Sequence, residues 1–405
     1  MGAETNFTVI VPVGTTSHGD PHLLCTPAKW YDYIIFFSLN YFIHAATVPS
    51  VPGETLLETG SAVLNALFVP GFGAIRALRR LVLRPRLKPK HPLDCALKAG
   101  ALAMVVRNLG DRPPDHWTYK TFEGASKERF DYLRVPKTRT FHGRYRLPKG
   151  YSLHTLPPGA KLAPVSSPRP AMEGEPKEDS FSKPAHQTSA VKVLFSLAQA
   201  VAGGVAIYRA RGDQIQQYGY GAFGLSVVPY VFMSVVNLTA LFLGPEFPSM
   251  YLVWTPDMDE AEQQGGDFEG IIATLVTPED GPDGLTERAD LLWYGPVSIF
   301  SWSIVYYLVL MAAPVCIVGG LSGFRPGDTS TAAQRGWILS WLIVGSVSSG
   351  VVAFFRAAML SEFATDRAFF FFFLFLAIPF WIPALGGMVM VGLELREYGI
   401  CSRLS

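Results

Sequence analysis

The segment AFFFFFLFLAIPFWIPALGGMVMVGL occupies residues 368–393 and carries no charged side chain over 26 residues. Arg367 precedes it and Glu394 follows it. A helix rises about 1.5 Å per residue, so roughly 20 apolar residues cross the hydrocarbon core of a bilayer. A buried helix of this length in a soluble protein almost always carries a polar stripe, and this segment has none. The chain is therefore predicted to be an integral membrane protein that contacts the lipid bilayer.

The composition agrees with a membrane protein. Of 405 residues, 49% are hydrophobic and 17% are charged, whereas soluble domains carry about 25% charged residues. The four cysteines lie at positions 25, 95, 316 and 401. Their spacings match no paired metal or redox motif, so we expect free thiols, with a disulfide between Cys25 and Cys95 as the alternative.

Seven apolar runs are long enough, or nearly so, to form transmembrane helices. In chain order they are Tyr33–Gly53, Thr59–Ile75, Val193–Tyr208, Gly221–Leu243, Tyr294–Leu321, Gly336–Phe355 and Ala368–Leu393. The second run is the weakest candidate, because Asn65, Pro70 and two glycines interrupt its 17 uncharged residues. We expect it to cross, with a re-entrant or surface segment as the alternative. The predicted fold class is an all-α membrane protein with about seven transmembrane helices.

These runs divide the chain into segments of different composition. The predicted boundaries are 1–29 for a polar N-terminal segment, 30–75 for the first two membrane segments, 76–190 for a basic loop with a disordered linker at 157–187, 191–243 for the third and fourth spans, 244–293 for an acidic loop, 294–395 for the last three spans and 396–405 for a tail.

The two long loops carry opposite charges. Residues 76–190 contain 23 Lys and Arg against 10 Asp and Glu, a net charge of +13, and residues 244–292 contain 12 Asp and Glu against one Arg, a net charge of −11. Two spans separate these loops, so they face the same side. Charges attract within a screening length of about 8 Å at physiological salt. We therefore predict one mixed extramembrane lobe from both loops, where a protein partner would bind, with two independent loops as the alternative.

The signals for orientation conflict. Seven basic residues between Arg76 and Lys90 favour a cytosolic location for the long loops. Six arginines near the opposite ends of the spans oppose this assignment. The sequon Asn6-Phe7-Thr8 is usable only with the N-terminus outside. If the second run crosses, the N-terminus shares the side of the loops. We expect seven spans and cytosolic loops, in the plasma membrane or an internal membrane.

Polar residues within or beside the first two runs are the candidates for an intramembrane site. Asn40 and His44 are four residues apart and share a helix face. An ionisable side chain at membrane depth marks a functional hypothesis. A neutral histidine that hydrogen-bonds a neighbouring helix is the simpler interpretation. Glu58, at the start of the second run, is expected at the membrane interface.

Small residues recur along the third run. They are Ala198, Ala202, Gly203, Gly204 and Ala206. Small side chains let transmembrane helices approach closely, so this face is predicted to pack against another helix.

A transition metal has one weak candidate site. His18, His22 and Cys25 have a usable spacing, but no further ligand is evident, so a plain polar segment is the preferred interpretation and no metal site is predicted.

Motifs of several function classes are absent from the sequence. There is no His-Glu-x-x-His, no Gly-x-Ser-x-Gly and no phosphate-binding Gly-x-x-x-x-Gly-Lys. We therefore expect no cofactor, and an enzyme is the less favoured class. The basic region around residues 117–151 is better explained by pairing with the acidic loop than by nucleic acid, which is not expected as a partner.

Three stretches carry a family resemblance: CTPAKWYDYIIFF from Cys25, NYFIHAATVPSVPGE from Asn40 and YRARGDQIQQYGYGAFGL from Tyr208. They resemble a group of uncharacterised multi-span membrane proteins of filamentous fungi. The resemblance covers the spans and implies a fungal source, with no activity and no residue roles.

Three function classes remain from the sequence. The favoured one is a non-enzymatic membrane protein that senses or assembles partners through its large loops. The second is a channel or facilitative carrier, although no inverted repeat and no mid-membrane carboxylate is apparent. The third is an intramembrane enzyme acting on a lipid or terpenoid, for which only His44, Asn40 and Glu58 offer a starting point.

Overall fold

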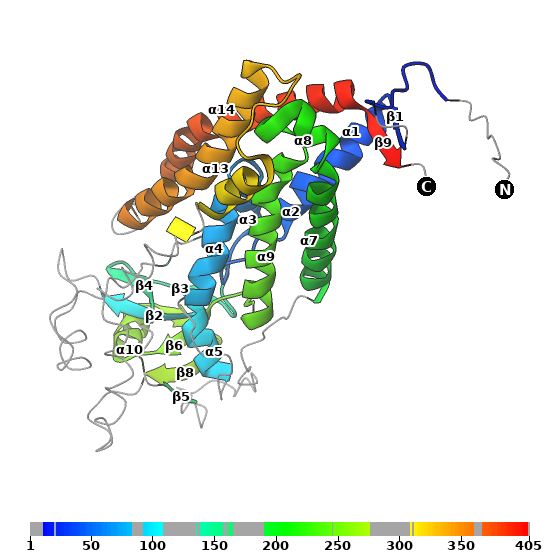
Figure 1. The fold of residues 1–405 in the computed structure, drawn as a ribbon. Coiled ribbons are helices and arrows are strands. Elements are labelled where there is room, and N and C mark those ends of the chain that lie inside the picture. The colour runs from blue at the N-terminus through cyan, green and yellow to red at the C-terminus, as the bar shows by residue number, and fades with distance from the viewer. Residues whose placement is uncertain are drawn as a thin grey trace, which may run out of the picture.

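The computed structural model describes residues 11–19, 22–82, 92–107, 135, 138–156, 160, 162–164, 190–244, 246–275, 308–309, 312–359 and 367–403. Long helices run side by side, and an α/β lobe lies beyond one end of them (Figure 1). We call these two parts the bundle and the lobe. The paired strands β1 and β9 lie at the opposite end of the bundle from the lobe (Figure 1).

The first helical segment is interrupted by a π-helix. It comprises α1 (Trp30–Phe37), the π-helix η1 (Ser38–Phe42) and α2 (Ile43–Ala46). Helical structure ends at Thr47, ahead of the prolines of the next segment, so this segment is shorter than the predicted run Tyr33–Gly53. π-Helical turns are rare and often occur at functional sites.

The second predicted run forms a helical hairpin. It contains α3 (Leu56–Phe68) and α4 (Pro70–Val82). Val69 between them has φ −130° and ψ 79°, because a residue before proline is disfavoured in the α region. The chain then returns, and Arg76 of α4 pairs with Glu54, just ahead of α3. A single crossing by this run is therefore not supported, and its re-entrant alternative fits the observed hairpin.

Five further labelled helices belong to the described part of the bundle, besides the helix Ala312–Ser322. They are α7 (Ala190–Ala210), α8 (Asp213–Tyr218), α9 (Val228–Leu243), α13 (Ala332–Met359) and α14 (Arg367–Tyr398), with the 3₁₀ turns η2 (Gly219–Gly221) and η3 (Leu225–Val227) between α8 and α9. In α14, both prolines of the longest apolar run lie inside the helix.

Three helices among the described residues are long and apolar enough to cross a membrane. They are Ala190–Ala210, Leu225–Leu243 and Ile378–Tyr398, which match the third, fourth and seventh predicted runs. A shorter apolar helix, Ala312–Ser322, represents the fifth run, of which residues 294–307 lie outside the described part. The prediction of seven spans is not supported, because the first run is shortened and the second turns back.

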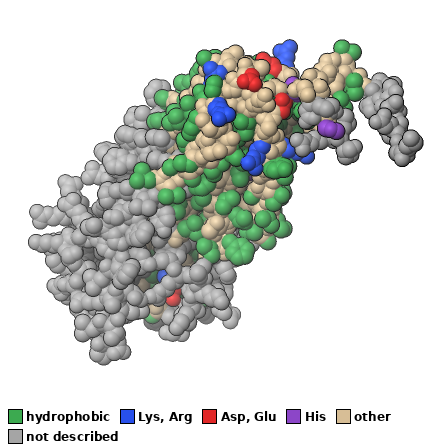
Figure 2. Space-filling model, in the orientation of Figure 1, with side chains coloured by type: hydrophobic (Ala, Val, Ile, Leu, Met, Phe, Trp, Pro, Cys, Tyr) green, Lys and Arg blue, Asp and Glu red, His purple; other side chains and the backbone are tan. Residues whose placement is uncertain are grey.

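The outer surface of the bundle is apolar. Figure 2 shows hydrophobic side chains over its flank, with charged side chains of the described residues concentrated toward the end that carries β1 and β9. On α7 and α9 the exposed side chains include Leu194, Phe195, Val201, Val205 and Phe242. Contiguous apolar surface of this kind marks contact with a membrane or a partner.

The lobe is built from both long loops. Its five-stranded sheet has the order β4-β2-β6-β8-β5. The basic loop supplies β2 (Leu102–Arg107), β4 (Tyr151–Thr155) and β5 (Leu162–Pro164), and the acidic loop supplies β6 (Tyr251–Trp254) and β8 (Ile271–Leu275). The central pairs β2–β6 and β6–β8 are parallel. The two loops therefore associate as predicted, and β5 lies inside the segment predicted to be a disordered linker.

One helix from each loop contributes to the lobe core. Side chains alternate across a strand, so Leu102 and Met104 of β2 pack with α5 (Pro92–Ala99), whereas Ala103 and Val105 join the cluster of α10 (Pro256–Gln263). A shorter pair, β3 (Tyr145–Arg146) with β7 (Asp267–Phe268), again joins the two loops. The alternating apolar pattern, rather than net charge alone, holds the loops together.

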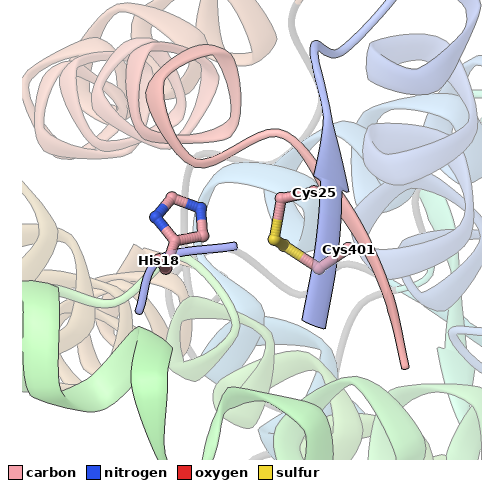
Figure 3. Close-up of side chains that lie close together, drawn as sticks. All are labelled: His18, Cys25 and Cys401. Carbon is pink, nitrogen blue, oxygen red and sulfur yellow. A yellow bond between two sulfur atoms is a disulfide. The ribbon is translucent and has the colours of Figure 1, made fainter. Parts of the chain in front are cut away.

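The two ends of the described chain meet in a strand pair. β1 (Leu23–Thr26) and β9 (Ile400–Arg403) are antiparallel, with Cys25 opposite Cys401. These cysteines form a disulfide, and His18 lies beside it (Figure 3). The expectation of free thiols is therefore wrong for this pair, as is the alternative bond between Cys25 and Cys95, and neither Cys95 nor Cys316 is in a disulfide. The pairing of β1 with β9 brings together two cysteines that are 376 residues apart in the chain. The spacing of the four cysteines in the sequence does not indicate this pair.

The disulfide predicts the number of reactive thiols. Alkylation of the denatured but unreduced protein is expected to label Cys95 and Cys316 only, and prior reduction is expected to add Cys25 and Cys401. Mass spectrometry of tryptic peptides measures both. Labelling of all four cysteines without reduction, in protein extracted with a thiol-blocking reagent present, would contradict the bond.

Candidate functional site

A buried polar layer lies where α2, α7 and α9 meet. The layer consists of His44, Thr47, Ser196, Gln199, Ser234 and Asn237, each with at most 6% of its surface exposed. His44 and Thr47 follow the π-helix, three residues apart, and Ser234 and Asn237 are likewise three apart on α9. Residues spaced in this way share a helix face, so each helix directs its polar pair inward.

Hydrogen bonds connect the first helical segment to α9. His44 Nδ1 lies 2.6 Å from Ser234 Oγ, and Asn237 Nδ2 donates to Thr47 Oγ1 at 3.5 Å. The backbone of Tyr230 also faces the His44 ring. The predicted contact of His44 with a neighbouring helix is therefore present. Asn40 is not part of it, because its amide donates back to Phe36 O in its own helix at 2.9 Å.

Helix α7 approaches the layer through Gly203. A Cβ atom on Gly203 would collide with Val231 of α9 and lie 3.5 Å from His44 Nε2. Because α7 and α9 are antiparallel with equal rise per residue, Gln199 lies near the level of Ser234, and Ser196 near that of Asn237. Of the small residues predicted to pack, only Gly203 is fully buried, and Ala198 and Ala202 are exposed.

Five buried polar atoms of this layer have no hydrogen-bond partner among the described residues. They are His44 Nε2, Ser196 Oγ, Gln199 Nε2, Gln199 Oε1 and Asn237 Oδ1. More than nine in ten buried polar groups in native proteins are paired, and each unpaired group costs about 1–3 kcal/mol. Such a concentration in one layer marks a place that can hold molecules with hydrogen-bonding groups.

Buried hydroxyl groups lie between the polar layer and the β1–β9 end of the bundle. Tyr41, three residues before His44, has its Oη 2.6 Å from Ser226 Oγ. Its ring centroid is 4.9 Å from that of Tyr230, whose hydroxyl donates to Leu67 O. The Tyr230 ring in turn lies 6.5 Å from that of His44. A cavity of about 10 Å³ beside Ser226, lined also by Tyr220 and Trp341, has room for roughly one water molecule.

Glu394 is a buried acid that the sequence analysis placed only at the charged end of the last run. Its exposed fraction is 0%, and neither carboxylate oxygen makes a hydrogen bond within ordinary limits among the described residues. The backbone of Phe223 faces it. Its helical spacing to Val391 and Tyr398, both buried, was a signal that it points inward.

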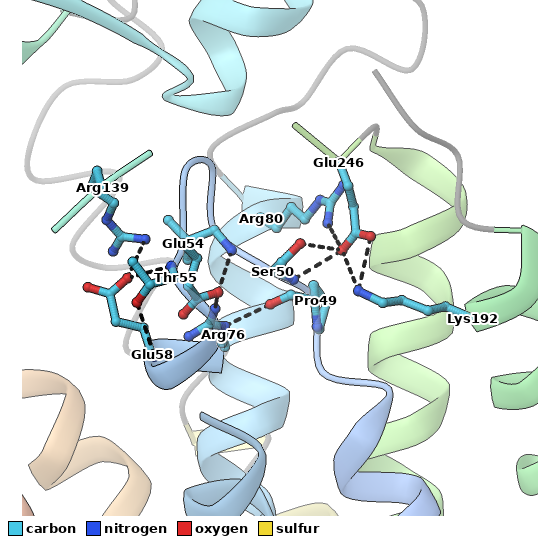
Figure 4. Close-up of polar contacts among 11 residues, drawn as sticks. Pro49, Ser50, Glu54, Thr55, Glu58, Arg76, Arg80, Arg139, Lys192 and Glu246 are labelled. Atoms are coloured by element: carbon cyan, nitrogen blue, oxygen red, sulfur yellow. Dashed lines mark hydrogen bonds and ion pairs between the residues drawn. The ribbon is translucent and has the colours of Figure 1, made fainter. Parts of the chain in front are cut away.

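Glu58 belongs to a different group, at the boundary between bundle and lobe. We call this group the ion-pair belt: Glu54, Glu58, Arg76, Arg80, Arg139, Lys192 and Glu246 (Figure 4). Glu58 caps α3 with Thr55 and lies 3.4 Å from Arg139. Glu58 therefore lies where the lobe meets the bundle, and its partners are outside the polar layer.

Glu246 joins four parts of the chain in this belt. It accepts hydrogen bonds from Ser50 N and Oγ at 3.0 Å, from Arg80 at 3.2 Å and from Lys192 at 3.1 Å. Burial alone would raise the pKa of this carboxyl, but Lys192, the Ser50 amide and Arg80 outweigh burial and lower the pKa below its usual value. Glu246 therefore remains ionised and fixes the ends of α4, α7 and α9.

The fold brings together only two of the three residues considered for a metal site, which were His18, His22 and Cys25. His18 and Cys25 lie with Cys401 so that their ligand atoms are within 4.8 Å of one another, whereas His22 is not in this group. The His18 ring stacks on Tyr398, and its Nε2 is 3.0 Å from Tyr398 O. Because the two sulfurs are bonded to each other, they are not thiolate ligands in this structure.

Comparisons with known proteins leave the site to be interpreted from its own geometry. No family model matches the sequence, and no curated protein and no solved structure is similar to it.

The Glu246 contacts predict a large effect of its removal. Glu246→Ala leaves Arg80 buried without its partner, so the free energy of unfolding should fall by about 3–5 kcal/mol. Glu260→Ala is the matched control, because the Arg107–Glu260 pair is half exposed and solvent screening limits its value to about 1 kcal/mol or less. Thermal unfolding of the purified variants in detergent measures both; equal effects would contradict the role of Glu246.

The same contacts predict how stability depends on pH. A lowered pKa in the folded state stabilises the protein above the ordinary carboxyl pKa of about 4.3, and this contribution is lost as pH falls through the lowered value. Thermal unfolding of wild type should therefore decline more steeply at acidic pH than that of Glu246→Gln.

Proposed function

We propose that the protein is a multi-pass integral membrane protein with six crossings and the α3–α4 hairpin inserted from one side. The crossings would be residues 30–46, α7, α9, the helix that ends at Ser322, α13 and α14. The three long apolar helices and the apolar flank of the bundle support this assignment. The arginines of α4 reach back to the ion-pair belt, which supports a hairpin that does not cross.

The disulfide supports an even number of crossings. β1 precedes the first helical segment and β9 follows the last helix, and the bond between Cys25 and Cys401 holds them together. Both therefore lie on one side of the membrane. Disulfides persist in oxidising compartments, and basic residues favour the cytosolic side. Arg76, Arg80 and Lys192 all form ion pairs at the lobe end of the bundle. Together these favour a cytosolic lobe and β1–β9 strands that face the exterior or a lumen.

Side-sensitive reporters test this orientation. A reporter at Gly14 is expected to be exterior or lumenal, and one at Gln264 cytosolic, in separate full-length proteins. Both positions are exposed or half-exposed and lie outside the helices proposed to cross. Reporters on the same side would require an even number of crossings between Gly14 and Gln264, and would contradict the proposed arrangement, which places three crossings between them.

For molecular function, we propose a channel or facilitative carrier that passes water and small uncharged polar molecules through the polar layer. The observation that carries this proposal is the group of five unpartnered polar atoms between α2, α7 and α9. A molecule such as urea or glycerol offers donors and acceptors to these atoms. Passage would include a local separation of the helices, since the layer is closely packed in this structure.

The chemistry of the layer favours uncharged molecules. Its hydroxyl and amide side chains are neutral and offer both donors and acceptors, and no Asp, Glu, Lys or Arg belongs to it. Transfer of an ion into an apolar region without a countercharge is far more costly than transfer of a neutral polar group. An ion would therefore meet a much higher barrier than a neutral solute.

Replacing Gln199 separates function from packing. Gln199→Met keeps the length of the side chain and removes both unpartnered atoms, so thermal stability should stay equal or rise. Passage should slow about fivefold to tenfold, because a lost hydrogen bond raises the barrier by about 1 kcal/mol. Stopped-flow light scattering of proteoliposomes after a urea or glycerol gradient measures passage.

Leu197→Met is the matched control for this test. Leu197 lies on the same helix and is 51% exposed on the apolar flank, so this variant should match wild type. Proteoliposomes no more permeable than empty liposomes, or a Gln199→Met variant with wild-type permeability, would contradict the proposal.

The lobe supports a second candidate, which is sensing or partner assembly. Arg139, in the basic loop, pairs with Glu58 of α3, so a partner bound to the lobe would act directly on the hairpin. This candidate would be favoured if wild-type proteoliposomes show no added permeability. An intramembrane enzyme is less supported. Of the three residues that could begin its site, His44, Asn40 and Glu58, only His44 lies in the polar layer.

A further inference from the structure

Glu394 has surroundings suited to bind a proton. Its carboxyl is fully buried, and the Tyr41 hydroxyl and the Phe223 backbone are near enough to interact with it electrostatically. On α13, which packs against α14, the guanidinium of Arg335 donates to Ser330. Titratable groups among the described residues that interact electrostatically with Glu394 include Glu397 on its own helix, Tyr41 from the first segment and Tyr218 from α8. None of these groups is a cation. An ionised carboxylate buried without a countercharge costs several kcal/mol, so a neutral acid is the favoured form.

The same position connects Glu394 to the polar layer. Tyr41 Oη bonds Ser226 Oγ, and Ser226 Oγ also donates to the carbonyl oxygen of Phe223, whose backbone faces Glu394. Tyr41 is one helical turn before His44, and Ser226 lies in the 3₁₀ turn that leads into α9. The two segments that surround Glu394 are therefore the same two that carry His44 and Ser234.

We propose that Glu394 is a proton-binding site whose ionisation controls passage through the polar layer. This inference rests on the proposed channel or carrier function. Loss of the proton to water at the β1–β9 end leaves a carboxylate, which attracts the hydroxyl proton of Tyr41. Tyr41 would then turn from Ser226 toward Glu394, and this change shifts the first helical segment relative to α9.

The chain offers a matched control for this site. Glu397 is on the same helix, one turn from Glu394, and is exposed to solvent. Glu394→Gln mimics the neutral acid in shape and hydrogen bonding and cannot lose a proton. Glu397→Gln makes the same chemical change outside the buried site. Glu394→Asp retains a titratable group and reports whether a carboxyl, rather than side-chain length, is required.

Infrared difference spectroscopy tests the proton site without reference to passage. The carbonyl stretch of a protonated, buried carboxyl should appear in wild type and disappear as pH is raised. Glu394→Gln should lack this signal, whereas Glu397→Gln should keep it and Glu394→Asp should show it at a shifted frequency. A signal that persists in Glu394→Gln, or one from Glu394 that does not change with pH, would overturn the proposal.

Permeability as a function of pH tests the control of passage. Wild-type proteoliposomes should change their urea permeability with the same midpoint as the infrared signal. Glu394→Gln should have a permeability independent of pH, while Glu397→Gln should stay pH-dependent with its midpoint moved toward lower pH, because a neighbouring negative charge has been removed. A pH-dependent Glu394→Gln variant would overturn the proposal. Wild type without any urea permeability would reject the proposed function and with it this control, and the infrared result would still decide whether Glu394 binds a proton.

Discussion

The carboxylate of Glu246 fixes the end of the bundle that faces the lobe, because four chain segments meet at it. Ser50 follows the first helical segment, Arg80 is in the last turns of α4, Lys192 is in the first turn of α7, and Glu246 itself follows α9. The first helical segment, α4 and α9 therefore end at one level, and α7 begins at that level, although these helices differ in length. The hairpin is fixed at the same level by the pair between Arg76 and Glu54.

Close helix contact within the bundle depends on glycines placed opposite large side chains. A Cβ atom on Gly203 would collide with Val231, and one on Gly386 would collide with Trp337 of α13. At Gly203 the close approach has a second effect, because it brings the backbone of α7 beside His44. The polar face of α7 is thereby enclosed, and its leucine, valine and phenylalanine side chains face outward. This arrangement is the reverse of a soluble helix and suits a lipid environment.

Apolar length and the order of the two charged loops made several parts of the fold predictable from the sequence. Three of the seven runs became long apolar helices, and the association of the two charged loops followed from their order along the chain. The hairpin was harder to predict, since 17 uncharged residues permit both crossing and return, and the turn depends on Val69 before Pro70 packing against Gly345 of α13.

Only part of the candidate site was predictable from the sequence. His44 stood out because an ionisable residue is rare in an apolar run. Gln199 and Asn237 did not stand out, since a single amide within a span carries no pattern of its own. Their importance comes from the packing of α7 and α9, which turns both side chains toward His44. The disulfide was likewise inaccessible, because strand register between the two ends of the chain decides it.

A purely structural explanation of the polar layer is difficult to reconcile with its chemistry. Side chains that only hold helices together are expected to be satisfied by each other, as Glu246 is by its four donors. In the polar layer, Gln199 has neither its donor nor its acceptor paired, and Asn237 has an unpaired oxygen. Apolar residues of similar volume would fill the same space at lower free energy. The layer and Glu394 are therefore better explained as groups whose hydrogen-bonding capacity is used by something that enters the bundle.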